Sequence, residues 1–487
     1  MPCTTILVGK KASYDGSTII ARNDDSGSGH YTSKKFAVIH PEEQPKIYKS
    51  VISHVEIELP ENPMRYTAMP NAEEGEGIWA ACGVNEAHVG MTATETITSN
   101  PRVLGADPLV RYQPAKDGKE EIPGGIGEED IVYIVLPYIH SAREGVKRLG
   151  SLLEQYGTYE MNGIAFQDVN EIWWLETIGG HHWIAKRVPD DFYVVMPNQF
   201  GIDEFDLEDA LGKQENHMCS KDLQEFIDLH HLNVSFDGGF NARDIFGSHD
   251  DSDHIYNTPR AWIIEKYLNP HTFDHHPEDD DIPWSLKPEK KITIEDVKYV
   301  LSSHFQGTDY DPYKNHGDLS KKGMYRPIGI NRNDFVSVIQ LRPYMPQEFQ
   351  AIEWIAYASN VFNALVPFYG AINETPDYLS NTTAEVSTDN FYWSSRLIAA
   401  MADASYRHSA IHIERYQRNV MSKGHQILFE YDQLLQKEKD STKQMILKHE
   451  ANQKIADMLK KETSKTLSLV LNELSHSMKN AFARSDA

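Results

Sequence analysis

The chain has 487 residues, 40% of them hydrophobic, and a formal net charge of −25 at pH 7. Such a chain can bury one large core or several small ones, and its acidic balance excludes binding to nucleic acid or anionic membranes through clustered Lys and Arg. Its start lacks an apolar signal-peptide core, and no apolar run approaches the about 18 residues of a membrane span. We expect a soluble, cytoplasmic protein with neither nucleic-acid nor membrane partners.

Residues 4 to 22 are predicted to form a β-hairpin. Two β-branched runs flank the turn signal Asp15-Gly16, and β-branched residues fit the pleated surface of a sheet. If Gly9 pairs near Ser17, the end of the second strand lies beside Cys3. The predicted register therefore decides which side chains surround this cysteine.

In that register Cys3 lies opposite Asn23, between Arg22 and Asp25. A guanidinium near the sulfur favours the thiolate, because the positive charge stabilises the ionised form. A carboxylate can accept a hydrogen bond from an α-ammonium group. The end of this strand is therefore a candidate site for nucleophilic chemistry.

Removal of Met1 and Pro2 would make Cys3 the N-terminal residue, with a thiol and an α-amine on one residue. An α-amine has an ordinary pKa of about 7.7 to 8.0 against about 8.5 for a thiol, so the amine can activate the sulfur at neutral pH. Cys82 lies in an apolar run and is expected in the core, and Cys219 has no supporting signal. Three cysteines in the chain fit a reducing compartment better than a disulfide framework.

Further along the chain, strand-like runs alternate with helical patterns, which indicates a mixed α and β protein. Apolar residues at helical spacing predict one helix from about Ile131 to Ile139 and another from Ile294 to Leu301. The predicted strands are residues 36–39, 77–82, 171–175, 193–196, 335–341 and 352–358.

Past about residue 390 the pattern becomes helical. One apolar stripe contains Leu428, Tyr431 and Leu435, and Lys-Glu-rich turns separate it from a second one. The second stripe consists of Leu467, Val470, Leu471, Leu474 and Met478. We expect residues 391–487 to be helices packed on the core of the same chain or on a partner subunit, so the protein could be a homo-oligomer.

Other chemistries have weaker support in the sequence. The acidic, His-bearing stretches 248–254 and 274–281 could bind a divalent metal, but they lack a fixed spacing such as His-Glu-x-x-His and are expected to be surface loops. Residues 124–127, Gly-Gly-Ile-Gly, are followed by three acidic residues that would repel a phosphate. No Gly-x-Ser-x-Gly motif is present, which argues against an α/β-hydrolase triad. We therefore expect no metal and no cofactor.

Several short motifs occur in a recognisable order and spacing. They are Cys3-Thr4-Thr5, Ala21-Arg22-Asn23-Asp24-Asp25, Gly83-Val84-Asn85-Glu86, Asp168 to Thr177, His182 to Ala185, Met196-Pro197-Asn198-Gln199, Asn257 to Trp262 and Val338 to Pro343. Together they resemble the pattern of the cysteine N-terminal-nucleophile (Ntn) hydrolases, most closely the dipeptidase A branch known from lactic acid bacteria. The likeness extends over most of the chain.

The resemblance implies an α+β fold: the four-layer αββα sandwich of the Ntn hydrolases in residues 1–390, followed by the helical C-terminal segment 391–487. It also implies roles for individual residues. Arg22 and Asp25 match the R-x-x-D pair beside the nucleophile Cys3. Asn198 resembles the asparagine whose amide donates to the oxyanion, and Arg260 the second arginine of the site. From the residues alone, Asn198 could instead be a turn residue and Arg260 part of a surface salt bridge.

The expected reaction is hydrolysis of a dipeptide through a thioester. The α-amine of Cys3 accepts the thiol proton, the sulfur attacks the scissile carbonyl, and Asn198 with a backbone N–H stabilises the oxyanion. Related acylases place another oxyanion-assisting residue where this chain has Thr94-Glu95, so part of the oxyanion hole differs. Asp24, Glu86 or Glu95 could bind one end of the dipeptide and an arginine the other. There are two alternatives. One is an amidase that acts on bile-acid or penicillin acyl amides, and the other is a non-catalytic interaction protein on the same fold.

Overall fold

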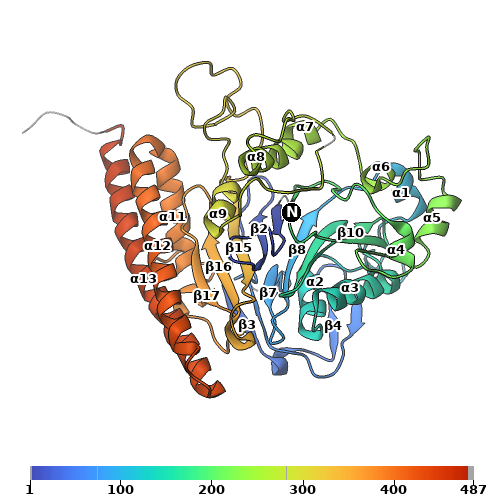
Figure 1. Cartoon of the computed structure of the whole chain (residues 1–487), viewed down its shortest axis with the longest axis horizontal. Coiled ribbons are helices and arrows are strands. Elements are labelled where there is room, and N and C mark those ends of the chain that lie inside the picture. Colours follow the sequence, from blue (N-terminus) through green and yellow to red (C-terminus); the bar gives the residue numbers. More distant parts are fainter. Residues whose placement is uncertain (1–2, 74, 281, 481–487) are drawn as a thin grey trace, which may run out of the picture.

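The computed structural model describes residues 3–73, 75–280 and 282–480, so the predicted removal of Met1 and Pro2 concerns residues outside this range. Two antiparallel sheets form the centre of the molecule (Figure 1). The seven-stranded sheet has the order β14 (Ser285–Leu286), β12 (Tyr193–Met196), β1 (Thr4–Val8), β2 (Thr18–Asp25), β15 (Asn333–Leu341), β16 (Ala351–Tyr357) and β17 (Val366–Tyr369). The six-stranded sheet has the order β13 (His217–Cys219), β11 (His182–Arg187), β10 (Ile172–Ile178), β9 (Asn162–Gln167), β8 (Gly90–Thr96) and β7 (Cys82–Val84).

Two small sheets and the helices complete the fold. The small sheets pair β3 (Ala37–Ile39) with β6 (Tyr66–Ala68) and β4 (Ile47–Lys49) with β5 (Glu56–Glu58). The helices before the C-terminal segment are α1 (Pro101–Ala106), α2 (Glu128–Val135), α3 (Ala142–Tyr156), α4 (Leu207–Leu211), α5 (Leu223–Leu229), α6 (Ala242–Phe246), α7 (Asp253–Tyr256), α8 (Thr258–Leu268), α9 (Ile294–Leu301) and α10 (Asp377–Ser380). Three short 3-10 helices are Pro41–Glu43, Leu136–Tyr138 and Gln347–Phe349, and the last helices are α11 (Phe391–Ala404), α12 (Tyr406–Leu435) and α13 (Ser441–His476).

Strand side chains alternate between separate apolar clusters, because successive residues of a strand point to opposite faces. Leu7 of β1 and Ile20 of β2 pack in one cluster with Trp174 of β10, so this cluster joins the two sheets. Ile6 of β1 instead belongs to the cluster on the other face of the seven-stranded sheet. Trp173 of β10 belongs to a third cluster, on the outer face of the six-stranded sheet.

Helices cover these outer faces. Residues of α8, α9, α11, α12 and α13 fill the cluster outside the seven-stranded sheet, and residues of α2 and α3 fill the one outside the six-stranded sheet. Figure 1 shows α11, α12 and α13 on the left beside β16 and β17, and α2 and α3 on the right below β10. The molecule therefore has a mixed helix and sheet fold, in which the two sheets face each other between helices.

Several predicted elements are confirmed, and two are wrong. Helix α9 and strand β12 have the predicted bounds, and β15 and β16 differ from them by one or two residues. The helix expected up to Ile139 ends at Val135, since Pro137 lacks the N–H that would continue it. The strand expected at 77–82 begins only at Cys82, because Trp79 and Ala81 have φ of 46° and 60°, which no strand allows.

The hairpin of β1 and β2 is confirmed, but its predicted register is wrong by one residue. Val8 pairs with Ile19 and Thr4 with Asn23, so continuing the register places Cys3 beside Asp24 rather than Asn23. The loop between the strands does not close tightly at Asp15-Gly16. Instead it docks on another segment, where the N–H groups of Lys11 and Ala12 donate to the carbonyl of Asp190 at 2.7 and 3.2 Å.

The C-terminal helices are tied to the seven-stranded sheet by buried polar contacts. Arg342 forms a bidentate ion pair with Asp432 of α12, at 2.6 and 3.1 Å, and the Asn452 amide of α13 bonds both the N–H and the carbonyl of Tyr369. The stripe through Leu428 and Leu435 is confirmed as buried.

The second predicted stripe is wrong in part, since Leu471 and Met478 are exposed. The buried side of α13 instead follows helical spacing further toward its start, through Ala451, Ile455, Leu459, Thr463 and Val470.

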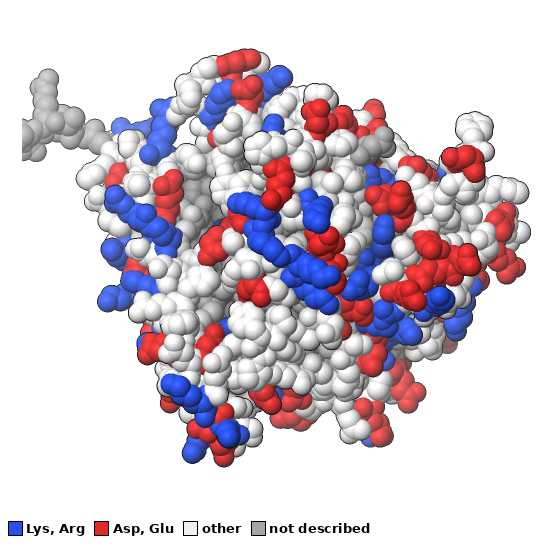
Figure 2. Space-filling view, in the orientation of Figure 1, with Lys and Arg blue, Asp and Glu red and all other residues white. Residues whose placement is uncertain are grey.

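Much of the acidic excess lies on the surface. Figure 2 shows acidic side chains gathered over α4 and α5 on the displayed face, and these helices carry the exposed Glu208, Glu225 and Asp228. Among residues 3–73, 75–280 and 282–480, no helix combines the length and the apolar character needed to cross a bilayer.

Candidate active site

Cys3 lies immediately before β1, and its side chain is fully buried. Its Sγ contacts Oδ1 of Asp24 at 3.8 Å, as the observed register requires. Burial raises the pKa of the Cys3 thiol well above its ordinary value, while the nearby Arg22 guanidinium opposes this rise. The expectation that Arg22 makes the sulfur a thiolate is therefore outweighed by burial here, and a base is needed to ionise the thiol.

The two faces of β2 carry different charged groups. On the face toward the six-stranded sheet, Arg22 donates to Asp24 at 2.7 Å and to the carbonyl of Thr94 at 2.6 Å. Lys34 reaches the other oxygen of Asp24 at 3.1 Å. Burial acts to raise the pKa of Asp24, but these two cations more than offset it and hold the carboxyl below its ordinary value.

Asp25 points to the opposite face of β2, toward the segment that precedes β15. Its carboxylate accepts hydrogen bonds from Arg326 and from the Asn333 amide, both at 2.5 Å. Burial raises the pKa of Asp25, and Arg326 opposes the rise. Arg22 and Asp25 are three positions apart, so a strand period of two places them on different faces.

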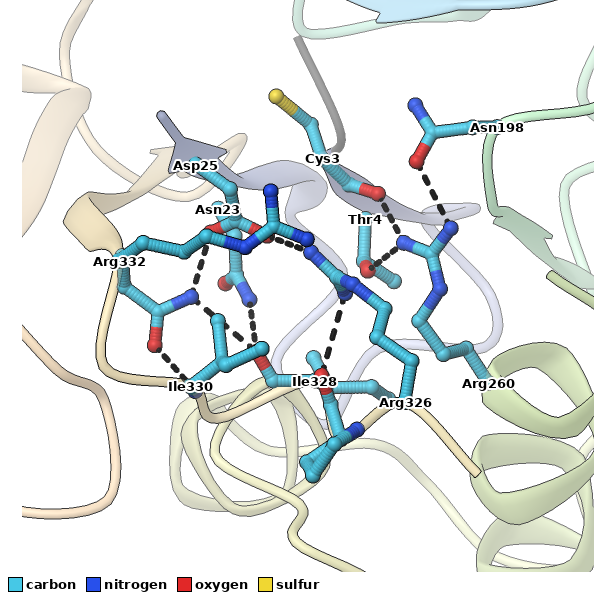
Figure 3. Close-up of polar contacts among 12 residues, drawn as sticks. Cys3, Thr4, Asn23, Asp25, Asn198, Arg260, Arg326, Ile328, Ile330 and Arg332 are labelled. Atoms are coloured by element: carbon cyan, nitrogen blue, oxygen red, sulfur yellow. Dashed lines mark hydrogen bonds and ion pairs between the residues drawn. The ribbon is translucent and has the colours of Figure 1, made fainter. Parts of the chain in front are cut away.

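Arg260, in the first turn of α8, connects the backbone of Cys3 to Asn198 (Figure 3). Each of its five N–H donors has an acceptor, so the guanidinium is saturated. Nε donates to the carbonyl of Tyr256, Nη1 to the carbonyl of Cys3 and to Thr4 Oγ1, and Nη2 to Oδ1 of Asn198 and of Asn257. The alternative of a surface salt bridge is wrong, because Arg260 is fully buried.

Asn198 follows β12 and is held from both ends of its amide. Its oxygen accepts from Arg260 at 2.7 Å, and its nitrogen donates to Glu95 at 3.2 Å. The other oxygen of Glu95 accepts from Thr5 of β1 at 2.7 Å. Burial raises the pKa of Glu95 to about 8, so its carboxyl is largely neutral at pH 7.

The five residues predicted from the sequence thus lie around the start of β1, in two groups. Cys3, Asn198 and Arg260 are joined by direct hydrogen bonds, and Arg22 reaches the sulfur through Asp24. Asp25 lies across β2 with Arg326.

The structural parts played by Asn257, Arg326 and Asn333 were not predicted from the sequence, and Asp24 and Glu95 were predicted only as possible binders of a substrate end. Asn257 stands in the same motif as Arg260, which was a usable signal. No sequence motif points to Arg326 or Asn333, since only the folded chain brings them to Asp25.

The two acidic, His-bearing loops contact each other at the surface, where His254 and Asp280 pair at 2.7 Å. Within the described ranges, which leave out Asp281, no three His, Cys, Asp or Glu side chains are grouped so that they could hold a metal ion. Cys82 and Cys219 are buried, and burial raises the pKa of each thiol to about 12.

Comparison with known proteins gives a consistent set of relatives. The profile of the family described as "Peptidase family C69" matches residues 2–419. The chain is 55% identical to "Dipeptidase" of Bifidobacterium longum (strain NCC 2705), over 100% of both chains. It is 53% identical to "Probable dipeptidase A" of Streptococcus pyogenes serotype M18 (strain MGAS8232), over 99% of this chain and 98% of the relative. It is 44% identical to "Dipeptidase A" of Lactobacillus helveticus, over 97% and 96%.

Proposed function

The chain belongs to peptidase family C69, and we propose that it is a cysteine dipeptidase whose nucleophile is Cys3, made N-terminal by removal of Met1 and Pro2. One observation carries the proposal: Arg260 binds both the carbonyl of Cys3 and the amide oxygen of Asn198. This contact fixes a nucleophile and an oxyanion donor relative to each other, which acyl transfer requires. The printed names of the relatives support the dipeptide as substrate.

The fold of the proposed enzyme is the four-layer αββα sandwich of the Ntn hydrolases, formed by residues 1–390. The apolar cluster between the two sheets and the helices on both outer faces support this assignment. Residues 391–487 form its helical C-terminal segment. The contacts of Asp432 and Asn452 with the seven-stranded sheet favour packing on the same chain, and a homo-oligomer is compatible with them.

The first step of the reaction is transfer of the thiol proton to the α-amine of Cys3. The raised pKa of the buried thiol supports the need for a base in direct contact with it. The sulfur then attacks the scissile carbonyl carbon, and the amine returns the proton to the nitrogen of the leaving residue. Water hydrolyses the resulting thioester and releases the other amino acid.

The surrounding residues have distinct parts in this mechanism. The amide nitrogen of Asn198 and a backbone N–H stabilise the oxyanion. Asp25 orients the Cys3 amine, and Arg22 contributes positive charge near the sulfur. Arg260 has no donor left for substrate, so it acts by positioning Cys3 and Asn198. The enzyme works in the cytoplasm on dipeptides, without a cofactor.

The test combines mass and activity. Cys3→Ala should abolish dipeptide hydrolysis, whereas Cys82→Ala, a matched change of another buried thiol, should retain most of it. Cys3→Ser should be strongly impaired, because a hydroxyl is a far weaker nucleophile than a thiol at neutral pH. Intact-mass measurement of active enzyme should find a chain that begins at Cys3. Fully active protein that retains Pro2 would contradict the mechanism, since the nitrogen of Cys3 would then be acylated and could not act as the base.

A further inference from the structure

The proposed mechanism restricts where the leaving amino acid of the substrate can lie. Its nitrogen receives a proton from the Cys3 amine, which Asp25 orients. The free carboxylate of a dipeptide is only two bonds away from that nitrogen. It is therefore expected near the Cys3 amine, on the face of β2 where Asp25 lies, which points away from Arg22.

This face is rich in arginine. The guanidinium groups of Arg260, Arg326 and Arg332 lie 5.2, 5.0 and 6.0 Å from the ring of Tyr256. Asp25 is the carboxylate paired with Arg326. Burial lowers the pKa of Arg260 to about 9, and repulsion between Arg260 and Arg326 contributes to this shift. A second carboxylate placed here would relieve the excess of positive charge.

The three arginines differ in how many hydrogen bonds they can still donate. Arg260 is saturated, and Arg326 donates to Asp25 at 2.5 Å and to the carbonyl of Pro327 at 3.2 Å. Arg332 donates to the carbonyl of Ser26 at 2.9 Å and to the Tyr256 hydroxyl at 2.6 Å, so contacts with described residues use two of its five donors. No described carboxylate lies within ion-pair distance of Arg332, and its side chain is half-buried rather than sealed in the core.

The segment that carries Arg326 and Arg332 is held in place by its own hydrogen bonds. The Asn333 side chain accepts from Ile330 N at 2.8 Å and donates to the carbonyl of Ile328 at 3.1 Å and to Asp25. In Figure 3 the side chain of Arg332 extends from the left of the view past Asp25 toward Arg326, and Arg260 lies further to the right. A guanidinium fixed in this way is preorganised for a planar, bidentate ligand.

We propose that Arg332, supported by Tyr256 and Arg326, binds the free α-carboxylate of the residue that leaves the dipeptide. This assignment rests on the proposed function, because it uses the Cys3 amine to locate the leaving group. The enzyme would then require a free C-terminus on its substrate because one half-buried arginine, Arg332, binds it.

The experiment compares a dipeptide with the same dipeptide amidated at its C-terminus, which removes the negative charge and keeps the scissile bond. Wild-type enzyme should prefer the free dipeptide. Arg332→Gln should lower the ratio of kcat/KM for the free dipeptide to that for the amide by about 10- to 100-fold, the cost of one or two charge-assisted hydrogen bonds. The change should be largely in KM, because the carboxylate is bound in both the ground and the transition state.

Arg148→Gln is the matched control. Arg148 also lies over a tyrosine ring, 4.6 Å from that of Tyr138, and donates to a backbone carbonyl, that of Ile134 at 2.9 Å, but it is on α3. Its substitution should leave the substrate ratio unchanged. If Arg332→Gln does not fold, Tyr256→Phe provides a second test. It keeps the ring and removes the hydroxyl that orients Arg332, so it should lower the same ratio by about 3- to 10-fold.

A wild-type enzyme that hydrolyses both substrates equally well would overturn the proposal, as would an equal loss on both substrates in Arg332→Gln. Either result is still compatible with Cys3 as the nucleophile, provided that Cys3→Ala is inactive. Failure of the proposed function would instead appear as activity in Cys3→Ala.

Discussion

The amide nitrogen of Asn198 donates to Glu95 Oε2 at 3.2 Å, so the proposed oxyanion donor contacts a buried carboxyl. Because Arg260 binds the amide oxygen, the orientation of the amide is fixed, with its nitrogen on the side of Glu95. The charge state of Glu95 therefore matters for the oxyanion. A neutral carboxyl tolerates negative charge close by, whereas an ionised one repels it.

Asn198→Ala should lower kcat for dipeptide hydrolysis by about 10²- to 10³-fold, the usual cost of removing one oxyanion donor. KM should change less, because the donor acts mainly in the transition state. Steady-state kinetics measures both, with the exposed Asn216→Ala as the control. A wild-type kcat in Asn198→Ala would mean that Asn198 is a turn residue and not an oxyanion donor.

Glu95→Gln should flatten the dependence of stability on pH. Burial raises the pKa of Glu95 from 4.5 to about 8, so the folded protein binds a proton that the unfolded chain releases. The stability that this proton contributes is complete below about pH 4.5 and is lost as the pH rises to about 8. Urea unfolding should show that, between pH 5 and pH 8, the wild type loses more of its free energy of unfolding than the variant does. The difference should be up to about 4 kcal/mol. Parallel curves for the two proteins would mean that Glu95 is not the titrating group.

Gly83→Ala should destabilise the protein by about 2 to 3 kcal/mol, the cost of overpacking a tight contact. A Cβ at this position would lie 1.7 Å from the backbone oxygen of Thr67, so β6 and β7 would have to separate. Gly105→Ala is the matched control, because a Cβ there meets nothing within 4 Å and α1 would gain helix propensity. Equal melting temperatures for the two variants would contradict the expected strain at Gly83.

Treatment with EDTA should leave dipeptide hydrolysis unchanged, and alkylation of thiols should stop it, if Cys3 is the nucleophile. Cys82→Ala enzyme should be alkylated and inactivated like wild type. Activity that is lost to EDTA and restored by zinc would transfer the chemistry to the loops that meet at His254 and Asp280.

Local patterns predicted the parts of the fold that depend on neighbours in sequence. The bounds of α9 follow from its apolar spacing and from Thr293, whose side chain caps the helix. The register of β1 and β2 could not be predicted in the same way. It depends on how the loop between them docks on Asp190, a contact with a distant segment.

The candidate site shows the same division. Cys3, Asn198 and Arg260 stand in motifs that resemble a known pattern, so they could be named from the sequence. Arg332 is 72 positions from Arg260 and 307 from Asp25 in the sequence, and no local pattern connects it to either residue. Its place beside Tyr256 arises only from packing of the segment before β15 against α7 and β2.

The spacing of Arg22 and Asp25 has a consequence for how this segment can vary. A deletion or insertion of one residue between them would move both charges to the same face of β2, where two opposite charges would pair with each other. The thiol would then lose its neighbouring cation, or Arg326 its buried carboxylate. Length changes should therefore not be tolerated within the four residues from Arg22 to Asp25, which form a boundary at the end of β2. A library of single-residue insertions across residues 9–25, selected for growth on a dipeptide, would map that boundary.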